Sequence, residues 1–185
     1  FGGGKISQIA VLAGMLLVAF LILIQLAPYR MDRLKVFLNP GIEPRGIGYQ
    51  INQAFIAIGS GGFWGRGFGQ SMQKYNYLPE PMGDSVFAIF AEEMGFLGSL
   101  ILIGAFLFFL WRGFRISKRA PDVFGKLLAA GLITSIVIQV FINMAAISGL
   151  LPLTGITLPF ISYGGTSLMV TLASVGILLN ISKYS

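Results

Sequence analysis

The fold is decided by the stretch from Val86 to Trp111, which reads VFAIFAEEMGFLGSLILIGAFLFFLW. It is apolar except for two adjacent glutamates near its start, Glu92 and Glu93. A helix needs roughly 20 apolar residues to cross a hydrocarbon core of about 30 Å. The stretch therefore predicts a membrane-spanning helix over residues 86–111.

Three other apolar runs are long enough for the same purpose. They cover residues 6–27, 124–151 and 161–181, and the second of them is interrupted by Gln139 and Asn143. Together with the first stretch they predict an all-α polytopic membrane protein with four transmembrane helices.

The composition supports this fold class and excludes others. Of the 185 residues, 55% are hydrophobic and only 11% are charged, whereas a soluble domain carries about 25% charged residues. The net charge of +6 comes from Lys and Arg at the ends of the apolar runs, which argues against a nucleic-acid partner. The sequence contains no Cys and no His, so disulfides, thiolate or imidazole metal sites and histidine bases are excluded from it.

The four predicted spans place residues 112–123 on one side of the membrane, together with both chain ends, and residues 28–85 on the other. The short connection 112–123 is densely basic, and short basic loops favour the cytoplasm. We therefore predict a cytoplasmic loop 112–123 and an extracellular loop 28–85. The sequence opens at Phe1 without Met, and we expect it to be part of a longer polytopic protein.

The extracellular loop is too long to be a passive connection. Within it, the apolar stretch 47–58 is too short to span, and we expect it to form a short interfacial or re-entrant helix. The loop is also basic, which is unusual for an outer segment and calls for an explanation.

Asp84 lies where this loop meets the second span. One interpretation is a helix N-cap, since Asp accepts backbone N–H bonds there. The other is a general base at the mouth of a membrane cavity, and the two are compatible. Glu92 lies eight residues further, on roughly the same helical face, and is either a paired structural carboxylate or part of a functional site.

Two other groups of residues each have two interpretations. Arg30 and Arg33, at the outer end of the first span, either anchor headgroups or hold a phosphate through bidentate hydrogen bonds. Ser162 and Gly164, at the start of the fourth span, either permit close helix packing or leave backbone groups lining a wet cavity.

Residues 77–95, YLPEPMGDSVFAIFAEEMG, resemble the motif of the SEDS family, which includes FtsW, RodA and SpoVE. Further blocks agree in family order at 28–40, 48–50 with 64–67, and 151–165. The resemblance implies a protein of about ten transmembrane helices, of which this chain supplies the last four and the large extracellular loop. Residues 64–75 are more similar to the division-type members, FtsW, than to RodA.

The resemblance also implies an activity. The family polymerises lipid II into peptidoglycan at the outer face of the bacterial cytoplasmic membrane, beside a class B penicillin-binding protein transpeptidase, other divisome proteins and membrane lipids. Asp84 matches the family's essential loop aspartate and would be the general base on the acceptor's 4-hydroxyl. Residues 81–83 depart from the Ala-His-Thr of many members. The remaining substrate-binding candidates for lipid II and its pyrophosphate are Arg30, Arg33, Arg66, Lys74, Glu92, Ser162 and Gly164.

No protein-bound metal is expected, and a divalent cation accompanying the pyrophosphate is left open. Two other functions are also left open. A lipid II flippase would need polar groups at the membrane midplane in several helices, where this sequence has only Gln139, Asn143 and the glutamate pair. A non-catalytic scaffold for the transpeptidase would keep its function without Asp84.

Overall fold

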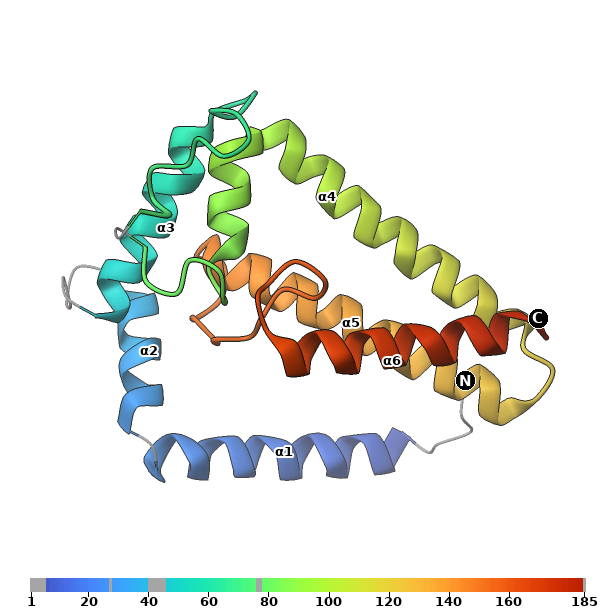
Figure 1. Cartoon of the computed structure of the whole chain (residues 1–185). Coiled ribbons are helices and arrows are strands. Elements are labelled where there is room, and N and C mark those ends of the chain that lie inside the picture. The colour runs from blue at the N-terminus through green and yellow to red at the C-terminus, as the bar shows by residue number, and fades with distance from the viewer. Residues whose placement is uncertain (1–5, 27, 40–45, 76–77, 185) are drawn as a thin grey trace.

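A computed structural model describes residues 6–26, 28–39, 46–75 and 78–184 of the chain. These residues form six α-helices and no strand (Figure 1), which confirms the all-α fold class. The helices are α1 (Ile6–Leu26), α2 (Pro28–Leu38), α3 (Ile47–Gly61), α4 (Val86–Arg119), α5 (Val123–Ile147) and α6 (Gly165–Ser182).

Three of these helices, α4, α5 and α6, are long and apolar enough to cross a membrane. In α1 the apolar stretch found among the described residues, Ala10–Ala19, is shorter than a full span. The membrane crossing of α1, and with it the count of four spans, stays a prediction.

The helix ends differ from the predicted limits. α4 continues to Arg119, so most of the segment predicted as a cytoplasmic loop is helical and the connection to α5 shortens to residues 120–122. α5 begins sharply because the Asp122 carboxylate caps it, accepting a hydrogen bond from the Gly125 amide at 2.7 Å. α6 starts later than predicted because residues 158–163 form a turn, in which the Ser162 amide donates to the Leu158 carbonyl.

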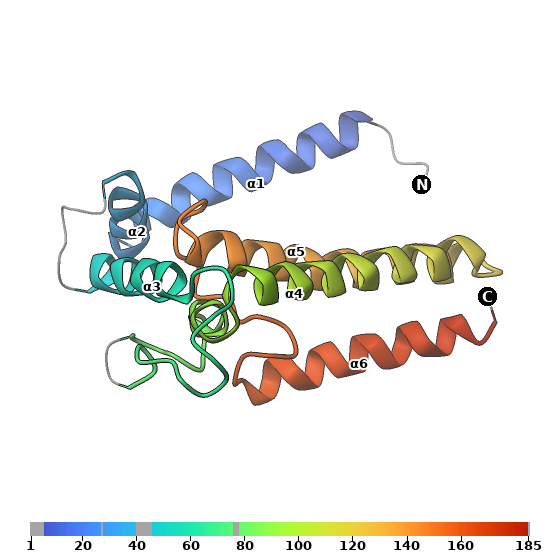
Figure 2. The ribbon, with the colours of Figure 1, turned by 90° about the horizontal axis from the view of Figure 1, so that it is seen from above.

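The long helices lie roughly side by side, with the start of α1, the α4–α5 connection and the end of α6 at one end of the molecule (Figures 1 and 2). α4 and α5 make the closest pair, because Gly113 leaves room for the Ile133 side chain. α6 packs on both of them. Among the described elements, α1 contacts only α2.

The opposite end of the molecule is built from the segment between α1 and α4. α3 packs against the first part of α4 through its small residues Ala54, Ala57 and Gly61, all of which are buried. Val36 of α2 and Phe87 of α4 belong to the same apolar core. The stretch predicted as an interfacial helix is therefore a full helix packed on the protein.

α4 is broken at Gly95, whose φ of 66° and ψ of −166° are not helical. A loop enters this break: the Gly67 amide donates to the Glu93 carbonyl at 2.9 Å, and the Phe96 amide donates to the Gly62 carbonyl at 2.9 Å. A Cβ on Gly95 would collide with the backbone of Gly65. The glutamates thus precede the long straight part of α4 instead of lying within it (Figure 1).

Candidate active site

Asp84 is half-buried in the loop just before α4. Its Oδ1 atom accepts hydrogen bonds from Gln50 Nε2 of α3 and from Ser85 Oγ, both at 3.3 Å. The N-cap of α4 is Ser85, and no side chain caps this helix. The carboxylate is therefore held by side chains and does not serve as the cap that one interpretation of the sequence expected.

The second carboxylate oxygen of Asp84 is open. Within the described part of the chain, Oδ2 receives no hydrogen bond. One oxygen is thus fixed while the other is free to accept a proton, an arrangement that suits a general base.

The Asp84 backbone is fixed from α5. The Nδ2 atom of Asn143 donates to the Asp84 carbonyl at 2.8 Å and to the Ile156 carbonyl at 2.7 Å. Asn143 is only 1% exposed, so these bonds are made away from water, where unpaired carbonyls are costly. A single amide ties the Asp84 loop to the segment that follows α5.

The side chain of Arg33 extends from α2 to the segment that follows α5, close to Asp84. Its Nη1 atom donates to the Leu153 carbonyl at 2.8 Å, and its guanidinium lies 4.8 Å from the centre of the Tyr29 ring. The point that a Cβ on Gly155 would occupy lies 3.4 Å from Arg33 Nη1 and 3.9 Å from Asp84 Oδ2. The guanidinium and the open carboxylate oxygen therefore face one glycine, although the two side chains form no ion pair among the described residues.

The arginine also has spare hydrogen-bonding capacity. Its Nε atom is buried and has no partner among the described residues. A buried donor without an acceptor is costly, and an anionic ligand at this place would satisfy it.

Ser162 and Gly164 lie on the other side of the Asp84 loop. Ser162 Oγ donates to the Gly83 carbonyl at 2.6 Å and accepts from the Leu158 amide at 2.7 Å. Gly164 is the N-cap position of α6. Both residues line a largely apolar hollow of about 440 Å³ together with Met82. The Ser162 hydroxyl is thus engaged with the backbone of the loop.

The remaining candidates form a separate cluster at the α4 break. Arg66 Nη1 lies 3.4 Å from Glu92 Oε1, and Lys74 Nζ lies 2.9 Å from Glu93 Oε1. Glu92 is 1% exposed and also accepts a hydrogen bond from Ser71 Oγ at 2.6 Å.

Each basic side chain of this cluster is paired with a carboxylate of the chain itself, so the cluster holds the loop on α4. The structure brings Arg33 to Asp84, but not Arg66, Lys74 or Glu92. The side chain of Arg30 lies outside the described part of the structure.

Sequence reasoning missed three residues of this site, Gln50, Asn143 and Gly155. The signal for the first two was present, because a polar side chain in an apolar stretch must find a partner inside the protein. Nothing in the sequence marked Gly155, whose φ of 72° and tight surroundings appear only in the folded chain.

Known proteins resemble this chain over its whole length. The model of the FtsW/RodA/SpoVE family, described as cell cycle protein, matches residues 1–185. The chain belongs to this family. It is a multi-pass inner-membrane protein, as the family membership and the three apolar helices show.

Two curated relatives illustrate the match within the FtsW/RodA/SpoVE family. Stage V sporulation protein E of Bacillus subtilis is 49% identical over 99% of this chain and 50% of its own length. A protein of Trichlorobacter lovleyi named probable peptidoglycan glycosyltransferase FtsW is 46% identical over 92% of this chain and 45% of its own length. The chain thus spans about half the length of these relatives.

Two solved structures share the fold. One, described as "Structural coordination of polymerization and crosslinking by a peptidoglycan synthase complex", has a TM-score of 0.68 and 28% identity, covering 95% of this chain and 48% of that chain. The other, the D255A mutant of the rod shape determining protein RodA from Thermus thermophilus, has a TM-score of 0.54 and 34% identity, covering 70% of this chain and 39% of that one.

Proposed function

We propose that this chain is the C-terminal part of a peptidoglycan glycosyltransferase that polymerises lipid II at the outer face of the inner membrane during cell division. The names of the FtsW relatives support the activity. The observation that carries the proposal is the Asp84 carboxylate, with one oxygen bound by Gln50 and Ser85 and the other open beside Arg33.

In the proposed reaction the open oxygen of Asp84 takes the proton of the acceptor's 4-hydroxyl. The hydroxyl oxygen then attacks the anomeric carbon of the donor, and the bond between that carbon and the pyrophosphate breaks. One displacement of this kind inverts the configuration of the sugar. The guanidinium of Arg33 stabilises the negative charge that develops on the leaving pyrophosphate.

The basic residues then divide into two roles. Arg33 contacts the pyrophosphate, and Arg30, three residues earlier on α2, is the second candidate. Arg66 and Lys74 instead hold the loop through Glu92 and Glu93. No step is assigned to a metal: in the described ranges no three acidic side chains gather, and a divalent cation would be held by the substrate's phosphates.

We further propose that the full protein works beside a class B penicillin-binding protein transpeptidase. The structural neighbour described as a peptidoglycan synthase complex supports this, because its description couples polymerization to crosslinking.

A flippase is less well supported by the contacts of the polar residues. Gln139 Nε2 donates to the Thr157 carbonyl at 3.0 Å, and Asn143 is bound to two carbonyls. Glu92 is bound to the loop. The polar groups that a transporter would offer to its cargo are engaged within the described chain.

The test is polymerisation of purified lipid II by the full-length protein with its transpeptidase, comparing Asp84→Asn with wild type. We expect polymer formation to be lost, because the amide cannot accept the proton, while the complex still co-purifies. Asp32→Asn is the matched control, since Asp32 is partly exposed and its ion pair among the described residues is with Lys35. Polymerisation by Asp84→Asn at the wild-type rate would refute the catalytic assignment and favour the scaffold.

A further inference from the structure

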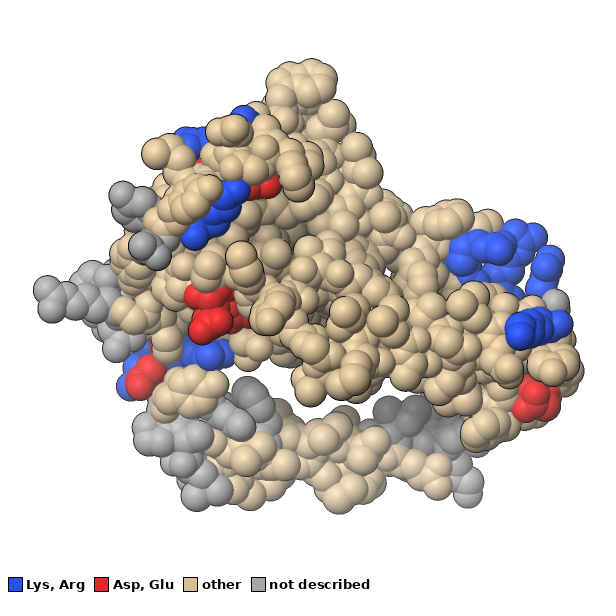
Figure 3. All heavy atoms as spheres, viewed as in Figure 1, with Lys and Arg blue, Asp and Glu red and all other residues tan. Residues whose placement is uncertain are grey.

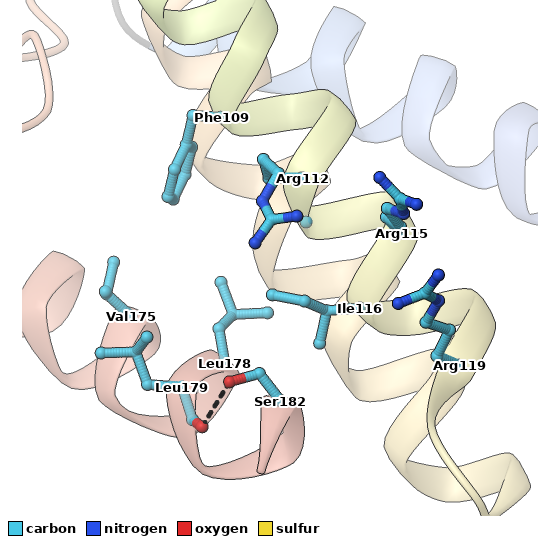
Figure 4. A pocket seen from close by; sticks show the side chains of 10 residues that line it. Phe109, Arg112, Arg115, Ile116, Arg119, Val175, Leu178, Leu179 and Ser182 are labelled. Carbon is cyan, nitrogen blue, oxygen red and sulfur yellow. Dashed lines mark hydrogen bonds between the residues drawn. The ribbon is translucent and has the colours of Figure 1, made fainter. Parts of the chain in front are cut away.

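A second hollow lies at the end of the molecule farthest from Asp84, between α4 and α6. Its volume is about 400 Å³. Arg112, Arg115 and Arg119 line it from α4 (Figure 4). The spacing of three and four residues places these arginines on one face of the helix. Figure 3 shows Lys and Arg gathered at this end of the molecule.

These arginines form no ion pair with an acidic residue in the described part of the chain. The ion pairs found among the described residues all lie elsewhere, and the nearby Asp122 carboxylate is engaged in capping α5. The carbonyl groups at the end of α4 attract Arg119 in the last turn, but the helix dipole fades within one turn and does not reach Arg112. Among the described residues, the three arginines of the hollow are therefore not neutralised by ion pairs.

Apart from Ser182, the rest of the wall is apolar. Phe109 and Ile116 of α4 face Val175, Leu178 and Leu179 of α6 (Figure 4). Phe109 and Val175 lie farther from the ends of α4 and α6 than the arginines do, whereas Ile116, Leu178 and Leu179 lie near the same helix ends as the arginines. This order matches a molecule with an anionic head at the membrane surface and a hydrocarbon tail in the bilayer.

We propose that this hollow is a binding site for one anionic glycerophospholipid. The phosphate is held by Arg112 and Arg119, because a guanidinium binds phosphate oxygens through two parallel hydrogen bonds. An acyl chain lies along Phe109 and Leu179. Arg115 lies 5.3 Å from the centre of the Trp111 ring, and this stacking keeps it at the rim.

The side of the membrane follows from the proposed function. If Asp84 acts at the outer face, the opposite end of α4 faces the cytoplasmic leaflet, where anionic lipids attract basic residues. Only this sidedness rests on the proposed function, because lipid retention is measured without any polymerisation assay.

The test is native mass spectrometry of the full-length protein, taken from nanodiscs of phosphatidylglycerol and phosphatidylcholine. We expect one phosphatidylglycerol to be retained by wild type. We expect each arginine to contribute about fivefold to the affinity, so Arg112→Gln with Arg119→Gln should weaken retention by about 25-fold. Lys183→Gln, a charge loss outside the hollow, is the control.

Two further experiments distinguish a lipid-binding site from a site that binds an anion alone. Val175→Trp fills the apolar part, and we expect it to abolish retention with the arginines intact and the thermal midpoint unchanged. Inorganic phosphate should not displace the lipid, and displacement would indicate an anion site without a tail. The proposal is overturned if Lys183→Gln costs as much as the arginine changes, or if wild type retains no lipid because the rest of the protein covers the hollow.

Discussion

Asp84 and Arg33 come from opposite ends of the loop region and meet at Gly155. The two side chains do not neutralise each other, since they form no ion pair in the described chain. An internal ion pair would have satisfied both groups and left nothing for a substrate. The separation keeps the open oxygen of Asp84 and the guanidinium of Arg33 beside the same glycine without an ion pair between them in the described chain.

The planar fork of Arg33 should matter as well as its charge. We expect Arg33→Lys to lower lipid II turnover by about 10- to 100-fold, because hydrogen bonds to charged groups contribute about 1.5–3 kcal/mol. The measurement is turnover by the full-length complex, with Lys118→Arg, a charge-conserving change at an exposed position outside both sites, as the control. Normal turnover by Arg33→Lys would move the pyrophosphate contact to another residue, with Arg30 the first to test.

Glu92 should behave as a structural residue. We expect Glu92→Ala to reduce the free energy of unfolding by about 1–3 kcal/mol, because Ser71 Oγ loses its buried acceptor. The amides of Met72 and Gln73, which donate to Glu92, should exchange hydrogen faster. Hydrogen-exchange mass spectrometry measures this, with Asp32→Ala as the control. Unchanged exchange with lost turnover would instead make Glu92 a substrate contact.

At the scale of elements, the break in α4 depends on the absence of side chains. Gly95 has a positive φ, and Gly65 from the entering loop lies against it with a φ of 81°. Either Cβ would strike the other segment's backbone. The two glycines let the loop backbone dock directly on the broken helix.

Two glycines of the same helix should therefore respond in opposite directions to alanine. Gly95→Ala should destabilise the protein by more than about 1 kcal/mol, since it adds a collision to an unfavourable φ. Gly104→Ala should stabilise it by up to about 1 kcal/mol, since its Cβ meets no atom within 4 Å and alanine favours the helix. The thermal midpoints of the purified variants measure both. Equal midpoints would show that the break tolerates a side chain.

The sequence predicted the long helices better than it predicted the contacts between side chains. Apolar length alone located α4, α5 and α6, because the membrane demands it. The same signal could not show the break, since a single Gly in an apolar helix is common. The pairing of Arg66 with Glu92 was also out of reach, because the two are brought together only by the docking of the loop. Asp84 was singled out by its position before a span and again by resemblance, whereas its neighbours Gln50 and Asn143 were identified only in the fold.

At the scale of the whole molecule, the arrangement places residues 62–75 and the α4–α5 connection at opposite ends (Figure 1). We expect Phe68→Cys, an exposed position, to react with a membrane-impermeant maleimide on intact spheroplasts. Pro121→Cys should react only after the membrane is opened. The chain itself has no cysteine, so labelling is clean once the rest of the protein is also cysteine-free. The reverse pattern would invert the predicted topology.

The amide of Asn143 has a mechanical consequence. Because this amide binds the carbonyls of both Asp84 and Ile156, we expect a shift of α5 to move Asp84 and the segment around Ile156 together. Arg33 donates a hydrogen bond to the Leu153 carbonyl of the same segment. Residues 153–157 are thus contacted by side chains of α2 and α5 and lie beside the loop that precedes α4. We therefore expect the spacing between Asp84 and Arg33 to be preserved when the helices around them shift.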